Sequence, residues 1–130
     1  MTIPTRDIPE RGDIFWADLP SYDSVGSEQR GARPVLILSV NIINASLPIC
    51  VIVPLSAQLA KANTNHRIRV LESERIQKPG TQGRGGESLA LTEQVRCIAR
   101  KRLDPKRVAR LKSVALASVE AGVKYVLGLP

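Results

Sequence analysis

Aromatic side chains are scarce in this 130-residue chain and make up 3% of it. One phenylalanine, one tryptophan and two tyrosines are all of them: Phe15, Trp16, Tyr22 and Tyr125. Sheets that bind single-stranded nucleic acid by stacking carry several aromatic rings on one face. The composition therefore excludes a ladder of stacked bases and leaves room for at most about two.

Histidine and cysteine are also rare. The single histidine, His66, excludes acid–base catalysis by a pair of histidines. Cys50 and Cys97 lie in apolar, strand-like sequence without a CxxC spacing, so we expect two buried free thiols rather than a disulfide. No group of His, Cys, Asp and Glu residues has the spacing of metal ligands, and we expect neither a metal nor another cofactor.

Long apolar runs are missing as well. The longest, Val35–Leu38 and Ile49–Leu55, fall far short of the roughly 20 residues that a membrane-spanning helix needs. The first residues contain no apolar centre of a signal peptide. These absences predict a cytoplasmic protein. The length predicts one domain, 1–130, in which residues 1–11 form an N-terminal arm.

Acidic residues are too few to balance the basic ones: 19 Lys and Arg residues face 12 Asp and Glu residues, a net charge of +7. A basic surface attracts polyanions such as nucleic acid. The alternative is a basic surface that serves solubility alone. The charge favours a polyanionic partner or substrate.

β-Branched residues are frequent and predict a mainly β structure. Pro34–Ser39 and Ile49–Pro54 are continuous apolar runs, typical of central buried strands, and Asn41–Pro48 is expected to turn between them. Shorter apolar or alternating patterns predict further strands at 12–18, 66–70, 88–91 and 94–99. The residues from 77 to 87 are rich in glycine and are expected to form a loop.

The last part of the chain is expected to be helical. Asp104 and Pro105 have the arrangement of a helix cap and a first helical residue, which predicts a helix over 104–111. A second helix is expected over Ser113–Leu127. Strands followed by helices predict an α+β fold: a small, strongly bent antiparallel sheet or barrel with C-terminal helices packed alongside.

The segment Gly26–Pro34, at the start of a buried strand, carries a distinctive set of polar groups. It contains Glu28, Gln29, Arg30 and Arg33 in a glycine-containing loop. Arginine presents a planar, permanently charged fork that suits a phosphate. A carboxylate close by in the sequence can orient an arginine or accept a proton. We therefore expect this loop to hold a phosphate.

Several motifs occur in a fixed order along the chain. They are RGDIFWADL at 11–19, GSEQ at 26–29 with RPVL at 33–36, VPLS at 53–56, and LALTEQVR at 89–96 followed by Arg102-Leu103. Through these motifs the chain resembles the MazF/PemK/Kid family of toxin–antitoxin ribonucleases. The resemblance implies an SH3-like barrel, a homodimer and metal-independent cleavage of single-stranded RNA, mRNA in particular, at short sequences.

The same resemblance implies products and partners. Cleavage would leave a 2′,3′-cyclic phosphate or 3′-phosphate and a 5′-hydroxyl, and it would inhibit translation and growth. A cognate MazE-like antitoxin with a flexible acidic tail would fill the RNA groove, in a heterohexamer or a similar assembly. Arg33 corresponds to the family's catalytic arginine, and Ser56 takes the place of a threonine in most members. The loop acid corresponds to Glu28.

The expected catalytic residues are therefore Arg33, Ser56 and Glu28. The expected RNA-binding residues are Ser27, Gln29, Arg30, Trp16, Gln94, Arg67, Arg69 and Arg84. Each has a structural alternative: an ion pair to Glu28 or Asp18 for Arg33, a turn cap for Ser56, a core or dimer position for Trp16, and a solvated basic rim for the outer arginines. The stretch 80–86 has no clear counterpart in the family.

The division of catalytic labour stays open at this point. Attack by the 2′-hydroxyl requires a proton acceptor, protonation of the leaving oxygen and stabilisation of the phosphorane charge. Glu28 is the more natural base, because a guanidinium stays protonated. The resemblance favours Arg33 as the principal catalytic group, and Ser56 would donate a hydrogen bond to a non-bridging oxygen.

Two other functions are consistent with the same fold. One is a toxin that binds a protein target, as the CcdB gyrase inhibitors do, and the other is a non-catalytic RNA-binding regulator. The combination of Glu28, Arg33 and Ser56 favours the ribonuclease, because a protein-binding surface needs no phosphate clamp in that loop.

Overall fold

A computed structural model describes residues 6–20, 26, 28, 31–58, 64–77 and 87–130. Within these ranges the strands form an antiparallel sheet in the order β4-β6-β3-β2-β1-β8-β5, with β7 paired to β3. The strands are β1 (Asp13–Leu19), β2 (Gly31–Ile37), β3 (Ile49–Ser56), β4 (Arg67–Val70), β5 (Arg75–Gln77), β6 (Ser88–Leu91), β7 (Arg96–Ala99) and β8 (Ala109–Leu111). The helices are α1 (Asn41–Ser46) and α2 (Ser113–Leu127), with short 3-10 turns η2 (Glu72–Glu74), η3 (Thr92–Gln94) and η4 (Arg100–Arg102).

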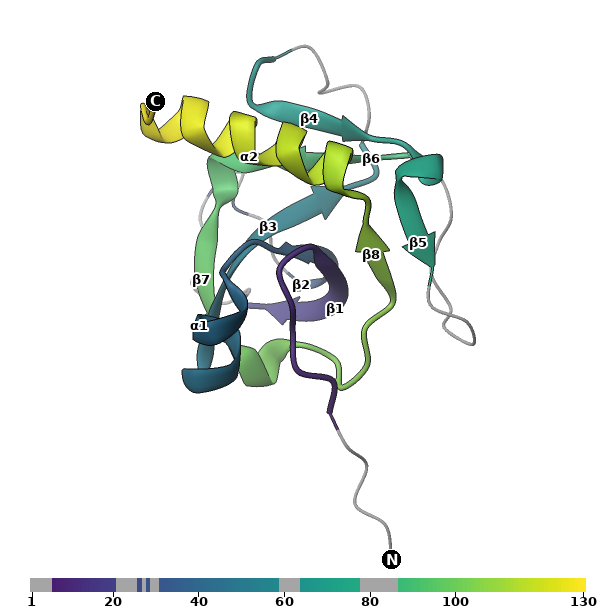
Figure 1. Ribbon diagram of the computed structural model, residues 1–130, viewed down its shortest axis with the longest axis vertical. Helices are drawn as coiled ribbons and strands as arrows, with labels where there is room; N and C mark the ends of the chain where they lie inside the picture. The colour runs from purple at the N-terminus through teal and green to yellow at the C-terminus, as the bar shows by residue number, and fades with distance from the viewer. Residues whose placement is uncertain (1–5, 21–25, 27, 29–30, 59–63, 78–86) are drawn as a thin grey trace, which may run out of the picture.

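The sheet curls because β3 changes partner along its length. Residues 49–52 of β3 pair with β7, and residues 55–56 pair with β6. On its other edge, residues 52–54 pair with β2. A strand that is shared between neighbours in this way turns a corner of the sheet. Figure 1 shows the resulting curved sheet with α2 lying across it, and the prediction of a small, strongly bent antiparallel barrel is confirmed.

The central strands separate two apolar cores, because successive side chains of a strand point to opposite faces. The first core lies under α2 and includes Ile14, Leu36 and Leu55 together with Val119 of the helix. The second core lies on the other face and is built around Phe15, with these neighbours: Ala17, Leu19, Val35, Ile37, Cys50, Ile52, Ile98 and Leu103. Ile14 and Phe15, neighbours on β1, thus lie on opposite faces of the sheet.

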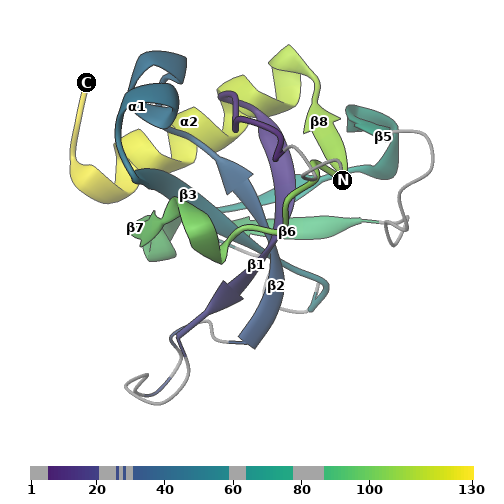
Figure 2. The same cartoon turned by 90° about the horizontal axis from the view of Figure 1, so that it is seen from below.

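Helix α2 approaches the sheet closely at a glycine, and its predicted bounds are confirmed. A Cβ atom on Gly122 would lie 3.0 Å from Ile68 Cγ1 and 3.0 Å from Thr92 Cγ2. The absence of a side chain therefore lets the helix backbone rest on β4 and η3. Figure 2 shows α2 crossing behind the strands in the perpendicular view. None of the helices in the described ranges has the length and apolar character needed to cross a bilayer.

The prediction of a helix over 104–111 is wrong. Backbone amides of this segment donate to carbonyls of β1 and the residue before it: Asp104 to Trp16 at 2.8 Å, Val108 to Ile14 at 2.9 Å and Leu111 to Gly12 at 2.9 Å. Residues 109–111 form β8, which pairs with both β1 and β5. The segment is extended because sheet partners on two sides take up the hydrogen bonds that a helix would have used.

The turn predicted over Asn41–Pro48 contains a short helix, α1. Its buried Asn44 donates a side-chain hydrogen bond to the Ser39 carbonyl at 2.8 Å, and the Ser39 hydroxyl accepts one from the Val51 backbone at 2.9 Å. The side-chain amide thus satisfies polar groups where the chain reverses between β2 and β3. Such local bonds do not produce an apolar period and so were not predicted.

One further expectation needs correction. Cys50 is buried as expected, but Cys97 is exposed, because it lies on β7 at a position that faces away from the second core.

The described part of the N-terminal arm is bonded to the segment that leads into β8. The Asp7 amide donates to the Pro105 carbonyl at 2.7 Å, and the Asp7 carboxylate accepts from the Arg107 amide at 2.8 Å.

Candidate functional site: a pocket at the ends of the central strands

The pairing of β2 with β3 brings Arg33 and Ser56 together. The strands are antiparallel, with Val35 opposite Pro54. Continuing this register by two residues places Arg33 opposite Ser56, and opposite residues of an antiparallel pair point to the same face. The arginine and the hydroxyl, 23 positions apart in the sequence, thus lie on the same side of the sheet where both strands end.

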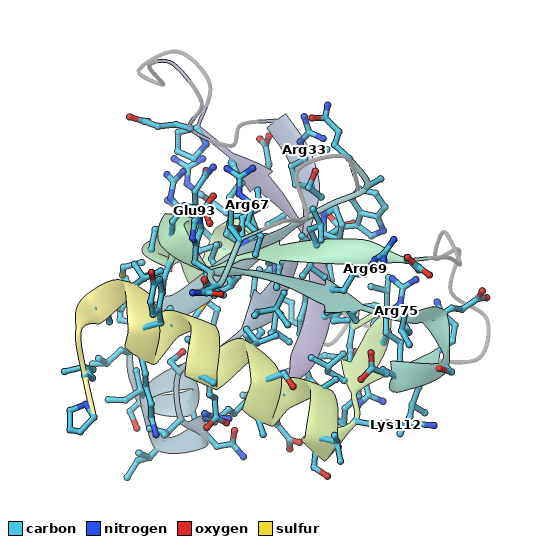
Figure 3. All side chains as sticks on the ribbon, turned by 90° about the horizontal axis from the view of Figure 1, so that it is seen from above. Arg33, Arg67, Arg69, Arg75, Glu93 and Lys112 are labelled. Carbon is cyan, nitrogen blue, oxygen red and sulfur yellow. The ribbon has the colours of Figure 1, made fainter. Side chains whose placement is uncertain are left out.

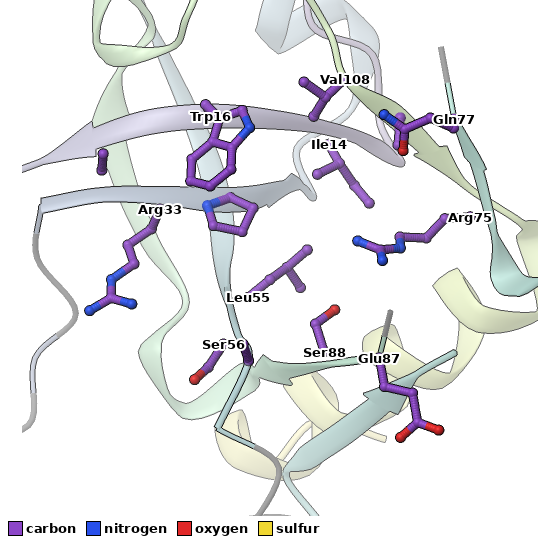
Figure 4. Close-up of a pocket in the computed structure, with 14 residues that line it drawn as sticks. Ile14, Trp16, Arg33, Leu55, Ser56, Arg75, Gln77, Glu87, Ser88 and Val108 are labelled. Atoms are coloured by element: carbon purple, nitrogen blue, oxygen red, sulfur yellow. The ribbon is translucent and has the colours of Figure 1, made fainter. Parts of the chain in front are cut away.

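A pocket of about 320 Å³ opens beside this pair. Its walls are largely apolar, and four polar side chains lie towards the end formed by β5 and β6. The lining residues are Ile14, Trp16, Ala32, Arg33, Pro34, Leu55, Ser56, Ala57, Arg75, Gln77, Glu87, Ser88, Val108 and Ala109. Figure 4 shows Arg33 and Ser56 on one side of the pocket, and Arg75 and Ser88 on the other. The volume lies at the lower end of the about 300–1,000 Å³ found for small-ligand pockets, which suits a single nucleotide.

Arg33 and Ser56 differ in their exposure to solvent. The side chain of Ser56 is buried, and its oxygen accepts a hydrogen bond from the Gln58 amide at 3.1 Å. This bond is the turn cap that the sequence offered as an alternative, but a hydroxyl that accepts one hydrogen bond can still donate its own proton. Arg33 is exposed, so its guanidinium is accessible to a ligand at the mouth of the pocket.

The strand that carries Trp16 is anchored by a buried carboxylate. Asp13 accepts hydrogen bonds from Arg110 Nε at 2.9 Å and from the Glu10 amide at 2.9 Å, and Arg107 Nη1 lies 3.5 Å away. The hydrogen bond to Asp13 raises the pKa of Arg110 above its already high ordinary value. This network fastens β1 to β8 and so holds the indole of Trp16 in the wall of the pocket.

A second groove lies next to η3. Its lining residues are Glu28, Arg67, Glu93, Gln94, Val95 and Arg96. Glu93 Oε1 accepts from Arg67 Nε at 2.8 Å and lies 2.7 Å from Arg67 Nη2, so the two charges neutralise each other in part. Figure 3 shows Arg67 and Glu93 together, apart from Arg69 and Arg75. None of the residues lining this groove also lines the pocket of Arg33.

A comparison with protein families decides the identity. The family described as PemK-like, MazF-like toxin of type II toxin-antitoxin system matches residues 10–127, nearly the whole chain. The chain belongs to this toxin family. Endoribonuclease EndoA of Bacillus subtilis is 32% identical to it over 122 residues, which cover 94% of this chain and 97% of the relative. The family predicted from the motifs is therefore confirmed.

Solved structures of MazF proteins share this fold. The crystal structure of MazF from Deinococcus radiodurans superposes with a TM-score of 0.68 at 21% identity, and it covers 95% of this chain and 99% of that one. The MazE–MazF crystal structure from the same organism gives a TM-score of 0.67, again at 21% identity, with the same coverage of the two chains. The MazF-like fold is thus found both in a MazF structure and in a MazE–MazF complex.

The residues predicted for the site of this MazF-like toxin fall into two groups. Trp16, Arg33 and Ser56 line the pocket, whereas Glu28, Arg67 and Gln94 line the η3 groove. Arg69 is exposed and its Nε lies 3.1 Å from Glu87 Oε2, at the edge of the pocket. The predicted contacts at Ser27, Gln29, Arg30 and Arg84 lie outside the described residues.

The predicted site residues did not include four polar residues of the pocket: Arg75, Gln77, Glu87 and Ser88. Arg75 and Gln77 belong to β5, whose three residues are too few to show a strand period. Ser88 did carry a signal. It begins the run Ser88–Leu91 and lies two residues before Ala90, which belongs to the first core. Residues two apart in a strand point to the same face, so the hydroxyl of Ser88 is expected on the core-facing side. The described residues contain no group of three or more His, Cys, Asp or Glu residues arranged to hold a metal ion.

Proposed function

We propose that this protein is a sequence-specific, metal-independent endoribonuclease toxin of a type II toxin–antitoxin system. Its substrate is single-stranded RNA, mRNA in particular, and the site of action is the cytoplasm, where translation occurs. Membership of the family and the similarity to endoribonuclease EndoA support the activity. The structural observation that supports the proposal is that Arg33, on β2, and Ser56, at the end of β3, both line one pocket.

The pair suits the stabilisation of a phosphorane. In the proposed reaction the 2′-oxygen forms a bond to the adjacent phosphorus and the bond from phosphorus to the 5′-oxygen breaks. The 2′-hydroxyl loses its proton and the leaving 5′-oxygen gains one, which yields a 2′,3′-cyclic phosphate and a 5′-hydroxyl. Arg33 binds the non-bridging oxygens through its planar fork, and Ser56 donates a hydrogen bond to one of them.

The position of Glu28 favours a contact with RNA over the role of proton acceptor. Glu28 lines the η3 groove with Gln94, and that groove shares no lining residue with the pocket of Arg33. We therefore assign Glu28 to binding of the RNA strand. A Glu28→Gln variant should raise KM more than it lowers kcat and should keep the acid limb of the pH–rate profile. Loss of that limb would return Glu28 to the role of base.

The decisive experiment is incubation of the protein with a long RNA in EDTA, followed by mapping of the fragment ends. We expect cuts at a short recurring sequence, with 2′,3′-cyclic phosphate or 3′-phosphate on one side and 5′-hydroxyl on the other. Arg33→Ala should lower the cleavage rate by about 10²–10³-fold, the loss typical of removing one transition-state donor. RNA that stays intact with the wild-type protein would contradict the proposal.

A matched control removes a cation elsewhere. Lys112 is exposed just before α2, and Figure 3 shows it far from Arg33 in the view. Lys112→Ala changes the net charge by the same amount as Arg33→Ala and should leave cleavage unchanged. Equal losses in the two variants would show that only the overall charge matters.

We also propose that the protein is a homodimer that binds a cognate MazE-like antitoxin with an acidic tail. The support for an antitoxin is the family and the MazE–MazF complex of similar fold. The support for self-association is an apolar surface at and around α1, where Val40, Ile42, Leu47 and Ile49 are exposed. Sedimentation equilibrium at micromolar concentration should give a dimer, and a monomer would contradict this part of the proposal.

A further inference from the structure

One polar group of the pocket, the hydroxyl of Ser88, has no partner among the described residues. The side chain of Ser88 is 7% exposed, and its hydroxyl finds no hydrogen-bond partner among the described residues. Buried hydroxyls are nearly always paired, because an unpaired one has lost its bonds to water without compensation. Figure 4 shows the hydroxyl of Ser88 directed into the pocket. A ligand in the pocket would supply the missing partner.

The pairing of β6 with β3 explains why the hydroxyl lies there. Leu55 is opposite Ala90 in this pair, and both belong to the first core. Ser88 lies two residues before Ala90 and therefore points to the same face. The first core thus continues outward along this face until it ends at Ser88, at the boundary between the core and the pocket. A hydroxyl at that depth can contact only something that enters between the apolar walls.

The groups at this end of the pocket are mainly hydrogen-bond donors. Figure 4 shows the guanidinium of Arg75 extending from β5 into the pocket, towards Leu55. A guanidinium has five N–H donors and no acceptor, and a serine hydroxyl can donate as well. The one carboxylate among the described lining residues, Glu87, lies 3.1 Å from Arg69 and points away from Ser88 and Arg75 in the figure.

The walls between Arg33 and Ser88 suit a flat apolar ring. Trp16 and Pro34 are opposite each other in the β1–β2 pair, and both line the pocket. Figure 4 shows Trp16 next to Arg33, with Ile14 and Leu55 further in. A nucleobase has apolar faces and a polar edge, so it can lie against such walls with its edge turned towards Ser88 and Arg75. A base attached to the phosphate at Arg33 would be within the same pocket, because both ends line one cavity of about 320 Å³.

We propose that the end of the pocket formed by Ser88 and Arg75 is a base-reading subsite. It takes one unpaired nucleobase next to the phosphate held by Arg33, and it prefers a keto base, uracil or guanine. The keto oxygen at C4 of uracil or C6 of guanine accepts hydrogen bonds from Ser88 and Arg75, whereas the amino group at the same position of cytosine or adenine would place its N–H against the guanidinium N–H. Ser88 is then a specificity residue of the reaction. This inference rests on the proposed ribonuclease function for the identity of its ligand.

The test has two arms. In the first, wild type and Ser88→Ala cleave a pool of random RNA, and the ends are sequenced. We expect one position next to the cut to be enriched in U or G for the wild type, and this preference should relax by about tenfold in Ser88→Ala, as for loss of one base-edge contact. The other positions of the recognised sequence should not change. Ser118→Ala, an exposed serine on α2, is the matched control and should cleave as the wild type does.

The second arm measures binding and does not depend on cleavage. The probes are four 2′-O-methyl dinucleotides, U–U, G–G, A–A and C–C, titrated by calorimetry into each variant. One of the two keto dinucleotides should bind about tenfold more tightly than A–A and C–C, and this ratio should fall towards one in Ser88→Ala and Arg75→Met. If wild type does not cleave RNA but this ratio holds, the proposed function fails and the subsite stands. If wild type cleaves RNA but Ser88→Ala keeps both preferences, the subsite is wrong.

The melting temperature separates a specificity role from a structural one. Because the Ser88 hydroxyl makes no hydrogen bond within the described residues, Ser88→Ala should melt at the same temperature as the wild type or higher. A clear fall in melting temperature would reveal a structural bond and would overturn the inference. Preference for adenine or cytosine at the affected position would overturn it as well.

Discussion

At the scale of single residues, the site depends on hydroxyls whose surroundings differ. Ser56 accepts a hydrogen bond from the Gln58 amide, so its orientation is held by the turn after β3. Ser88 has no such partner among the described residues. We infer that Ser56 is preorganised for the phosphate, whereas Ser88 is satisfied only by substrate. The two serines should therefore respond differently to substitution.

Ser56→Ala should reduce both activity and stability. Loss of a hydrogen bond to a charged group costs about 1.5–3 kcal/mol, which corresponds to a fall in kcat/KM of roughly 10–100-fold. The lost cap to Gln58 should lower the free energy of unfolding by about 1 kcal/mol. Ser56→Thr keeps the hydroxyl and should retain most activity. The measurements are cleavage of a fluorogenic RNA and urea unfolding, and equal activity of the alanine variant and the wild type would contradict the assignment.

The two cysteines should differ in reactivity with pH. Burial raises the pKa of Cys50 from its ordinary value of 9.0 to about 11, whereas Cys97 is exposed. The thiolate is the reactive form, so iodoacetamide at pH 8 should modify Cys97 alone, and both residues only after unfolding. Because the folded pKa is the higher one, the stability from the buried neutral thiol is complete below about pH 9 and is lost towards pH 11. Peptide mass spectrometry checks the first outcome, and modification of native Cys50 would contradict it.

At the scale of secondary-structure elements, the position of α2 controls the η3 groove. Gly122 lets the helix contact Thr92, the first residue of η3, and Thr92 is fully buried with its backbone amide bonded to the His66 carbonyl at 3.3 Å. Glu93 and Gln94 follow directly and line the groove. A shift of α2 should therefore displace Glu93 and Gln94 in the groove.

Gly122→Ala should destabilise the protein although alanine favours helix. The propensity gain is about 1 kcal/mol, but a Cβ atom 3.0 Å from Ile68 and Thr92 requires a shift of packed groups, which costs about 1–3 kcal/mol. We expect a net loss of about 1 kcal/mol in urea unfolding and weaker RNA binding. Ser118→Ala, at an exposed position of the same helix, should instead gain a few tenths of a kcal/mol. A Gly122→Ala variant more stable than the wild type would show that α2 can shift away from Ile68 and Thr92 without a packing cost.

At the scale of the whole molecule, the net charge of +7 should govern RNA affinity. Several cations are already engaged: Arg67 is paired with Glu93, and Arg110 is paired with Asp13 and Glu10. Only some of the 19 Lys and Arg side chains are therefore available to phosphates. Arg33, exposed at the pocket, is among the arginines we expect to contribute.

Affinity for 2′-O-methyl RNA should fall with salt. Each phosphate contact on a single strand contributes a slope of about −0.7 in log K against log salt concentration, because condensed counterions are released on binding. Arg33→Ala should make the slope shallower by about 0.7, and Lys112→Ala should leave it unchanged. Fluorescence anisotropy over a salt series measures both slopes. Identical slopes in wild type and Arg33→Ala would mean that Arg33 does not contact a phosphate.

The accuracy of the sequence predictions depended on how local each signal was. The apolar runs around Val35 and Ile52 identified β2 and β3, because burial on both faces gives an unmistakable pattern. The segment 104–111 was predicted wrongly as a helix because its amides bond to β1, more than 80 positions earlier in the sequence. Asp104 and Pro105 resemble a cap, but nothing in their neighbourhood reveals the strand partners.

By itself, the amino-acid sequence determined the family and the barrel of short strands, because motifs and apolar periods are formed by neighbouring residues. It also predicted Arg33 and Ser56 as a catalytic pair. Only the tertiary structure decided which side chains share a cavity. It placed Glu28 in the η3 groove and brought Arg75 and Ser88 into the pocket of Arg33. The physical reason is that the pocket is enclosed by strands that come together through pairing and through the curvature of the sheet. The register between strands distant in the sequence is set by the packing of the whole core rather than by any local pattern.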